Sequence, residues 1–373
     1  MSDSSASSGK SSCPGSSPGR ELRDGLSDGL VPLASLDLAG VRSVDDLVRG
    51  MGRTAFAGRS VGEAADVLEA MIRDPDCLVV CTLSGAMTIA KMGLVLCDML
   101  DQGWLQAVVS TGALMAHGFV EATGRVHFKY DPRMDDAELF ERGYDRVYDT
   151  LELEQSLDDV EPIVRAALES FAEGAPFASY ELHDRLGAWL EENVEGRGVL
   201  KSAWRSRVPV YVPAFTDSEI GLDVALHARR CRARGARPPV YDGFLDLEAY
   251  TAQIVRAPRI GVFTVGGGVP RNWAQQVAPY LDILKTRLGE DVPTRRFLYG
   301  VRLCPEPVHW GGLSGCTYAE GVSWGKFVAP GDGGRFAEVL ADASVTWPLV
   351  ARAVQERLAR DPAPPKRFDW QMD

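Results

Sequence analysis

Lys326 is the residue of this sequence whose surroundings most favour covalent chemistry. It follows a Trp-Gly pair within the run Gly321-Val322-Ser323-Trp324-Gly325-Lys326-Phe327-Val328. A lysine enclosed by apolar neighbours loses part of its hydration, so its amine is neutral at a lower pH and can act as a nucleophile. The alternative, from this run alone, is an ordinary lysine at a strand end whose ammonium group points into water.

Three turns made of small residues each follow an apolar run typical of a buried strand. The runs are residues 77–83, 107–109 and 259–265, and a helical pattern follows each turn. The turns are Ser84-Gly85-Ala86-Met87, Ser110-Thr111-Gly112-Ala113 and Gly266-Gly267-Gly268-Val269-Pro270. In this setting the N-terminus of a helix can receive a phosphate group. The alternative is that small residues only let helix and strand pack closely, and the triple glycine is not a GxGxxG fingerprint.

The repeated order of strand, turn and helix predicts the elements that must position these residues. It indicates an α/β fold with a doubly wound, mostly parallel sheet and helices on both faces. We expect a helix at 88–102 and further strands at 297–303, 339–344 and, with prolines typical of an edge, 208–214. The polar and aromatic segment 125–150 is expected to form loops around a pocket rim.

Composition excludes several kinds of partner. The chain has 373 residues, 45% hydrophobic and 25% charged, and its net charge of −12 argues against nucleic acid or an anionic membrane as a main partner. No run of about 18 apolar residues predicts a membrane span. The seven cysteines are irregularly spaced and the five histidines form no HxxxH or HExxH group. We therefore expect reduced thiols, a cytoplasmic protein and no metal site.

The two ends of the chain differ in composition from the middle. Residues 1–30 are rich in Ser and Gly and are expected to be a disordered extension, because they offer too little apolar surface to offset the entropy of ordering. Residues 361–373 form a Pro-rich tail in which a helix cannot continue. Residues 31–360 then hold the folded protein, in which the turns can either bind a cofactor or only let helix and strand pack closely.

The assembled segments resemble the deoxyhypusine synthase family over roughly residues 40–360. The strongest match is Glu320-Gly321-Val322-Ser323-Trp324-Gly325-Lys326, which is similar to the catalytic segment of that family. The other matching segments, in chain order, are Ser84-Gly85-Ala86, Ser110-Thr111-Gly112-Ala113, Thr216-Asp217, Gly266-Gly267-Gly268 and Ala341-Asp342-Ala343-Ser344.

The resemblance implies a Rossmann-like fold, a homotetramer and NAD as cofactor. Members of the family oxidise spermidine with NAD, carry the aminobutyl group on a lysine as an imine, and pass it to a lysine of a translation factor. By resemblance, Lys326 carries the imine, Trp324 lines the polyamine channel and Glu320 binds the substrate. The residues implied to contact NAD are Ser84, Gly85, Thr111, Gly112, Ala113, Asp217, Gly267, Gly268, Asp342 and Ala343. Of these, Asp217 and Asp342 suit the ribose hydroxyls.

Several positions depart from the family pattern. Trp310 and Leu313 stand where acids are expected, and after Asp217 the second acid falls on Leu222, although Asp223 is adjacent. Two further departures are Trp273 in place of a histidine proton carrier and His117 in place of a glutamate. We take Ser314, Trp310, Trp273 and His117 as the substrate-binding residues. Fewer acids imply a substrate less cationic than spermidine, with His117 or His309 available for proton transfer.

Three functions remain open on the sequence. The first is a deoxyhypusine synthase-like, NAD-dependent transferase that moves an alkyl or aminoalkyl group between amines through an imine on Lys326. A small amine is the expected acceptor, rather than a protein lysine. The second is a homospermidine synthase-like enzyme with a diamine acceptor. The third is a catalytically silent homologue that binds NAD.

Overall fold

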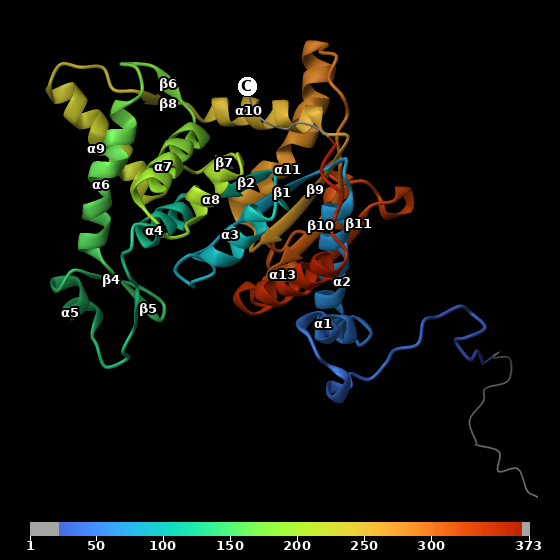
Figure 1. The fold of residues 1–373 in the computed structure, drawn as a ribbon. Helices are drawn as coiled ribbons and strands as arrows, with labels where there is room; N and C mark the ends of the chain where they lie inside the picture. The colour runs from blue at the N-terminus through green and yellow to red at the C-terminus, as the bar shows by residue number, and fades with distance from the viewer. Residues whose placement is uncertain (1–21, 368–373) are drawn as a thin grey trace, which may run out of the picture.

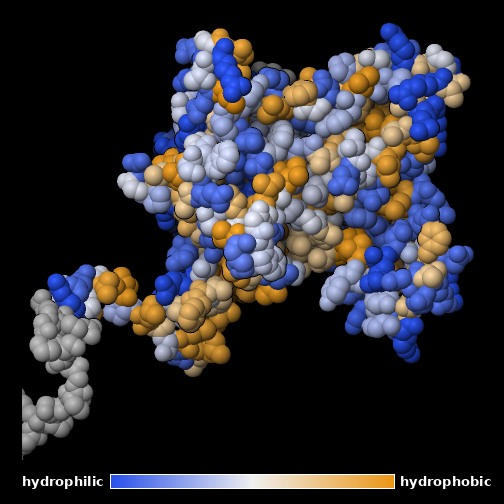
Figure 2. Space-filling model, turned by 180° about the vertical axis from the view of Figure 1, so that it is seen from behind, coloured by the Kyte–Doolittle hydropathy of each residue, from blue (hydrophilic) through white to orange (hydrophobic). Residues whose placement is uncertain are grey.

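The computed structural model describes residues 22–367. The predicted disordered extension 1–30 falls mostly in residues 1–21, outside the described residues, as do residues 368–373 of the predicted tail. Residues 22–33 lead away from the body of the protein at the N-terminal end (Figure 1), whereas Ala34 N donates to Arg53 O at 3.0 Å. The apolar side chains of Leu22, Leu26, Leu30 and Val31 are exposed. Figure 2 shows apolar surface over the segment next to the grey residues.

A six-stranded parallel sheet forms the centre of the fold (Figure 1). Its order is β11-β10-β9-β1-β2-β7. In chain order the strands are β1 (Cys77–Leu83), β2 (Ala107–Ser110), β7 (Val210–Tyr211), β9 (Arg259–Val265), β10 (Phe297–Leu303) and β11 (Arg335–Val339). The chain runs outward from β1 in one direction and then returns to β9 and runs outward in the other. This doubly wound order confirms the predicted fold class, and it places the point where the strand order reverses, at which open α/β sheets bind ligands, at the carboxyl ends of β1 and β9.

Helices bury both faces of the sheet, which explains why its strands read as continuous apolar runs. Side chains of β1 alternate between two cores: Val79 and Cys81 enter one, and Leu78 and Val80 enter the other. The first core is closed by α2 (Phe56–Arg73), α3 (Gly93–Asp101), α4 (Gly112–Ala122) and α13 (Ala343–Arg360). The second core is closed by α10 (Gly243–Arg256), α11 (Gly268–Ile283) and α12 (Tyr318–Ser323).

A mostly helical lobe continues beyond the β7 edge of the sheet (Figure 1). Its helices are α6 (Glu154–Glu169), α7 (Ser179–Asn193), α8 (Val199–Arg205) and α9 (Glu219–Ala233), with the short parallel pair β6 (Pro176–Phe177) and β8 (Val240–Tyr241). The prediction that 125–150 forms loops is wrong. This segment holds α5 (Asp136–Glu141) and most of an antiparallel sheet of β3 (Phe128–Lys129), β4 (Tyr144–Val147) and β5 (Thr150–Leu153).

Two predicted elements have different bounds in the structure. The helix expected at 88–102 begins only at Gly93, because Lys91 has a left-handed φ of 61° and interrupts the helical backbone. The strand expected at 339–344 is wrong, since β11 ends at Val339. Asp342 instead caps α13, and its carboxylate accepts a hydrogen bond of 2.8 Å from Ser344 N.

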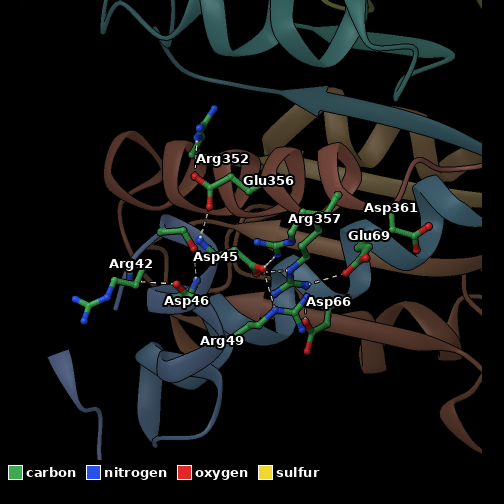
Figure 3. Close-up of polar contacts among 12 residues, drawn as sticks. Arg42, Asp45, Asp46, Arg49, Asp66, Glu69, Arg352, Glu356, Arg357 and Asp361 are labelled. Atoms are coloured by element: carbon green, nitrogen blue, oxygen red, sulfur yellow. Dashed lines mark hydrogen bonds and ion pairs between the residues drawn. The ribbon is translucent and has the colours of Figure 1, made fainter. Parts of the chain in front are cut away.

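A buried ion cluster fastens the first helix, α1 (Val44–Gly52), to α2 and α13 (Figure 3). The side chain of Arg357 is 1% exposed and donates to Asp45 at 2.6 Å, Asp66 at 2.7 Å and Glu69 at 3.0 Å. Asp45 comes from α1, and Asp66 and Glu69 come from α2. One arginine of α13 therefore joins three helices.

The end of the described chain also packs on α2. The ammonium group of Lys366 donates to the carbonyl oxygens of Met71, Ile72 and Asp74, which lie at the C-terminal end of α2. A cation is favourable at this end of a helix, because the last carbonyl groups lack partners within the helix. In the part of the chain that the structure describes, no helix has the length and apolar character needed to cross a membrane.

Candidate active site

The turns after β1 and β9 meet at the point where the strand order reverses. Ser84 N donates to Val265 O at 3.0 Å, and Ser84 Oγ accepts from Gly267 N at 2.7 Å. Gly266 has a φ of 80°, and a Cβ there would lie 2.3 Å from Ser84 Oγ. The turn therefore requires a glycine at 266 for its backbone conformation and for its contact with Ser84.

Two glycines of these turns border open space. A Cβ at Gly85 would meet no atom within 4 Å, and one at Gly268 would meet only Ser314 Oγ, at 4.0 Å. Gly268 also begins α11, so unpaired backbone N–H groups point out of the helix here. Close access to backbone at a helix N-terminus is what the phosphates of a dinucleotide require.

The other predicted cofactor residues follow strands β2, β7 and β11, at the carboxyl ends of the parallel strands. Thr111 caps α4, and its hydroxyl accepts from Leu114 N at 3.4 Å. A Cβ at Gly112 would lie 2.5 Å from Ser218 Cβ, so this glycine lets the N-termini of α4 and α9 approach each other. Asp217 precedes Ser218, and its side chain is exposed, as is that of Asp342 beyond β11. Both carboxylates are thus available to a ligand's hydroxyl groups.

Lys326 lies on the face of the sheet covered by α11 and α12. Its carbonyl oxygen accepts from Phe297 N at 2.9 Å, which fixes its backbone beside the start of β10. Gly325, with a φ of 66°, provides the turn after α12 that brings the lysine back to the sheet. The residue is only 8% exposed. The solvated strand-end alternative is therefore excluded by its burial.

The amine of Lys326 is held by a neutral group. Its Nζ donates to Asn272 Oδ1 at 2.9 Å, and within residues 22–367 no carboxylate lies at ion-pair distance from it. Burial lowers the pKa of Lys326 below that of a free lysine, and the positive charge of Arg271 lowers it further. The charge of Glu320 opposes this effect but does not reverse it. The amine is therefore neutral at a lower pH than an ordinary lysine, as an imine-forming lysine requires.

The other two predicted catalytic residues lie toward solvent. Glu320 belongs to α12 and is exposed, yet its charge acts on both Lys326 and Cys316. Trp324 is 66% exposed in the single chain, so its indole does not by itself keep water from the lysine. Burial of Lys326 comes instead from α11, α12 and the face of the sheet that they cover.

The loop between β10 and α12, residues 304–317, packs on the glycine turn and leads to the segment that carries Lys326. It includes the predicted substrate residues Trp310 and Ser314. Ser314 packs on the turn so closely that a Cβ at Gly267 would lie 2.4 Å from its Cα. The neighbouring carbonyl of Leu313 accepts from Arg271 Nη1 at 3.1 Å, and Arg271 precedes the asparagine that holds Lys326. The side chains of Trp310 and Leu313 are exposed.

Trp273 lies among aromatic residues, whereas its neighbour Asn272 contacts Lys326. The Trp273 ring centroid is 5.1 Å from that of Tyr250 and 5.9 Å from that of Tyr211. Sequence reasoning missed Asn272 and Arg271. The signal available was the position of Arg271 and Asn272 five and six residues after the first glycine of the turn Gly266-Gly267-Gly268.

His117 belongs to a separate polar network beneath the small antiparallel sheet. Its Nδ1 lies 2.6 Å from Glu152 Oε2, and His127 Nε2 lies 3.0 Å from Glu152 Oε1. The structure does not bring His117 together with Lys326 through any contact among the described residues. Burial raises the pKa of Glu152, but hydrogen bonds from the two histidines, together with the positive charge that these rings carry when protonated, outweigh it and lower this pKa to about 2.

His117, His127 and Glu152 have the side-chain types and spacing of a metal site, which the sequence did not predict. However, the ammonium of Lys91 lies 2.6 Å from His127 Nδ1. It must donate to that nitrogen, so the proton of the neutral ring sits on Nε2 and faces Glu152. Nε2 then has no lone pair for a cation. We interpret the network as a polar connection between α4 and the sheet of β3, β4 and β5.

The fold and site together define a class of protein: a doubly wound α/β protein with a dinucleotide-type crevice and a buried lysine held by a neutral amide. Comparison with known families matches residues 46–354 to deoxyhypusine synthase. The chain is 34% identical over 330 residues to "Probable deoxyhypusine synthase 2" of Methanosarcina mazei, covering 88% of this chain and 91% of that protein. It is 30% identical over 336 residues to "Deoxyhypusine synthase-like protein" of Chlorobaculum parvum, covering 89% and 91%.

The chain therefore belongs to the deoxyhypusine synthase family, as its sequence motifs indicated. The fold comparison agrees. A solved structure from Entamoeba histolytica, provisionally named as a deoxyhypusine synthase, aligns with a TM-score of 0.55 and 14% identity, over 91% of this chain and all of that one. At this identity the likeness concerns the fold alone. Family membership supports a transferase of the aminobutyl type in general terms.

Proposed function

We propose that this protein is an NAD-dependent transferase that moves an alkyl or aminoalkyl group from a donor amine to an acceptor amine through an imine on Lys326. One observation carries the proposal: the amine of Lys326 is buried and hydrogen-bonded at 2.9 Å to a neutral oxygen of Asn272. Most lysines are exposed and charged, and burying one without a carboxylate partner costs free energy. Its lowered pKa provides the nucleophile that imine formation needs.

The residues of the glycine crevice fit NAD. The backbone at Gly85 and Gly268 is open to a ligand, and Asp217 and Asp342 are exposed beyond the carboxyl ends of β7 and β11, the two outermost strands of the sheet. Ser84, Thr111, Gly112, Ala113, Gly267 and Ala343 complete the proposed cofactor site. Bound NAD would supply a hydride acceptor and, once reduced, a hydride donor. An aspartate at the ribose favours NAD over NADP, because a carboxylate repels a 2′-phosphate.

The proposed transfer begins with oxidation of the donor amine. The carbon beside the donor nitrogen loses a hydride and the nitrogen loses a proton, which gives a C=N bond. The neutral amine of Lys326 adds to that carbon and the original amine leaves with a proton, so the group is now an imine on Lys326. The acceptor amine displaces Lys326 in the same manner, and the returned hydride reduces the new C=N bond to an amine.

Side chains around Lys326 have defined tasks in this scheme. Asn272 orients the lysine amine without adding a charge that would keep it protonated. Glu320 attracts the ammonium group of the donor, and we infer that Trp324 closes over the bound amine. The exposed apolar side chains of Trp310, Leu313 and Trp324 offer a surface that a second chain could cover. This supports the tetramer and the dry pocket that we propose by family analogy.

A small amine, rather than a protein lysine, is our proposed acceptor, and the cytoplasm our proposed compartment. The first inference rests on the neutral residues Trp310 and Leu313 of the loop beside the site. The second rests on cysteines that the structure leaves unpaired, Cys77, Cys81, Cys97, Cys231, Cys304 and Cys316.

Borohydride trapping tests the proposal. Incubation with NAD and a panel of amines, followed by borohydride, should add the alkyl group to Lys326, as located by mass spectrometry. Lys326→Arg should abolish the adduct. A matched control is Lys366→Arg, which alters a half-buried lysine whose pKa is also lowered, chiefly by burial. That variant should label normally. Absence of both adduct and amine-dependent NADH absorbance would instead identify a silent NAD-binding homologue.

The same panel of amines distinguishes two possible enzymes that share this chemistry but differ in their acceptor. Transfer to added putrescine would identify the homospermidine synthase-like alternative. Labelling of a translation factor alone would overturn our preference for a small acceptor.

A further inference from the structure

We propose that Arg271 binds a carboxylate of the amine substrate, so that the group transferred through Lys326 comes from an amino-acid-like amine. This inference rests on the proposed function and names its substrate class. It comes from the hydrogen bonds of Arg271, a side chain that is 2% exposed and lies next to the residue holding Lys326.

The guanidinium of Arg271 has donors without acceptors. Nη1 donates to the carbonyl oxygen of Leu313 at 3.1 Å. Nε and Nη2 are fully buried and have no hydrogen-bond partner among residues 22–367. The guanidinium carbon lies 5.2 Å from the ring centroid of Tyr318, which stabilises its charge but occupies neither N–H group. A buried donor left unpaired costs about 1–3 kcal/mol, and more for a charged group.

The two other buried arginines of the described chain are paired with carboxylates. Arg302 binds Glu338, and Arg357 binds Asp45, Asp66 and Glu69. Arg271 has no such partner within residues 22–367, although its side chain is as buried as theirs. An arginine remains protonated at all physiological pH values, so it cannot lower this cost by losing its charge. An anionic ligand would supply the missing partner.

The two unpaired nitrogens form one binding edge. Nε–H and Nη2–H of a guanidinium point in nearly the same direction and together match the two oxygens of a carboxylate. Nη1, which lies on the other edge, is the nitrogen already used by Leu313. The bond to Leu313 therefore fixes the guanidinium and leaves its bidentate edge available.

Contacts with α12 place the guanidinium on the side of α11 that holds Lys326. Arg271 precedes Asn272, whose Oδ1 accepts from Lys326 Nζ at 2.9 Å. The guanidinium carbon of Arg271 lies over the ring of Tyr318, which begins the helix that leads to Lys326. The positive charge of Arg271 accordingly contributes to the lowered pKa of Lys326. On the exposed side of the same site, Glu320 carries the opposite charge. An amine that also bears a carboxylate complements both charges.

Paired amines that differ by one carboxylate test the proposal. We would titrate the protein, in the presence of NAD, with ornithine and putrescine and with lysine and cadaverine, by calorimetry. The wild type should bind the carboxylated member of each pair more tightly. Arg271→Met should reduce this preference about 10–100-fold, the range expected for a charged bidentate hydrogen bond. Arg271→Lys keeps the positive charge but lacks the two parallel N–H groups, and should give an intermediate preference for the carboxylated amines. Arg335→Met, at an exposed arginine of β11, is the matched control and should keep the preference.

Calorimetry of amine binding tests the carboxylate site at Arg271 independently of the proposed transferase reaction at Lys326. Selective binding of the carboxylated amines without any Lys326 adduct would support the Arg271 site and defeat the transferase. Equal binding, or tighter binding of the uncarboxylated amines, would overturn the Arg271 site even if Lys326 is labelled. A loss of NAD affinity in Arg271→Met and Arg271→Lys, with the amine preference intact, would assign the guanidinium to the cofactor phosphates and also overturn it. Circular dichroism confirms that each variant is folded.

Discussion

The amine of Lys326 lies 2.9 Å from the side-chain oxygen of Asn272, and this contact joins the segment after α12 to the helix that begins at the glycine turn. One end of α11 therefore borders the proposed cofactor crevice, and its second turn holds the proposed nucleophile. A rigid helix between two parts of a site keeps them at a fixed separation, as group transfer and hydride transfer at one substrate require.

Changing Asn272 to Asp should slow imine formation at neutral pH. The new carboxylate would stabilise the ammonium form of Lys326 and raise its pKa, so fewer amines would be neutral. We expect the rate of borohydride-trapped labelling at pH 7 to fall about tenfold or more, and to recover as the pH rises. Asn193→Asp, at an exposed asparagine that ends α7, is the control. An unaltered pH dependence of labelling in Asn272→Asp would contradict a role for Asn272 at the lysine.

Changing Gly267 to Ala should weaken NAD binding. Its Cβ would lie 2.4 Å from Ser314 Cα, so the loop that carries Ser314 must move away from the turn. We expect about a tenfold loss of NAD affinity, measured by calorimetry, because small displacements of a binding loop have large effects. Gly103→Ala is the control: this glycine has a φ of 70° but meets no atom within 4 Å. Equal NAD affinities for both variants would show that the turn does not form the cofactor site.

Changing Arg357 to Met should destabilise the whole fold. The substitution removes the buried partner of the Asp45 carboxylate, leaving it only the exposed Arg49 and Arg360, and breaks the connection of α1, α2 and α13. Breaking a buried ion pair in this manner costs about 3–5 kcal/mol in the free energy of unfolding, measurable by urea denaturation. Arg352→Met removes an exposed pair with Glu356 on the same helix and should cost less than about 1 kcal/mol. Similar losses for both variants would refute a special role for the buried cluster.

Changing Glu152 to Gln should destabilise the protein most between pH 5 and 6. The pKa of Glu152 falls from 4.5 to about 2 on folding, so its contribution is complete above 4.5 and is lost as the pH falls toward 2. Burial lowers the pKa of His117, but Glu152 outweighs this and raises it above 6.5. The histidine's contribution is therefore complete below 6.5 and is lost as the pH rises through the raised value.

Thermal unfolding of wild type and Glu152→Gln across this pH range measures the difference. At the pH where this difference in the free energy of unfolding is largest, we expect it to be about 3 kcal/mol, the lower end of the cost of breaking a buried ion pair. Glu138→Gln, at an exposed pair with Arg142, should show no such maximum. A difference between wild type and Glu152→Gln that does not vary with pH would contradict the coupling of Glu152 to His117.

The sequence by itself predicted the architecture and identified Lys326 as the candidate nucleophile. The runs 77–83, 259–265 and 297–303 were predicted with the bounds of β1, β9 and β10, because strands buried on both faces are continuously apolar and end at glycine or polar residues. The edge strand near β7 was marked by prolines. Lys326 was identified by its local run and by family resemblance. Shorter exposed elements were missed or misplaced, since β11 and the sheet around β4 lack a strong apolar pattern.

Only the tertiary structure decided which side chains face Lys326. Successive residues of an α-helix point about 100° apart, so Asn272 reaches the lysine while Trp273 turns into the aromatic cluster of Tyr211 and Tyr250. The sequence pattern of α11 could not choose between them, because the choice depends on how the helix is rotated against the sheet. The same packing buries Arg271 beside the lysine and leaves its fork unpaired. Motifs thus identify the proposed reactive lysine, whereas the proposed carboxylate-binding charge of Arg271 depends on contacts between segments distant in the chain.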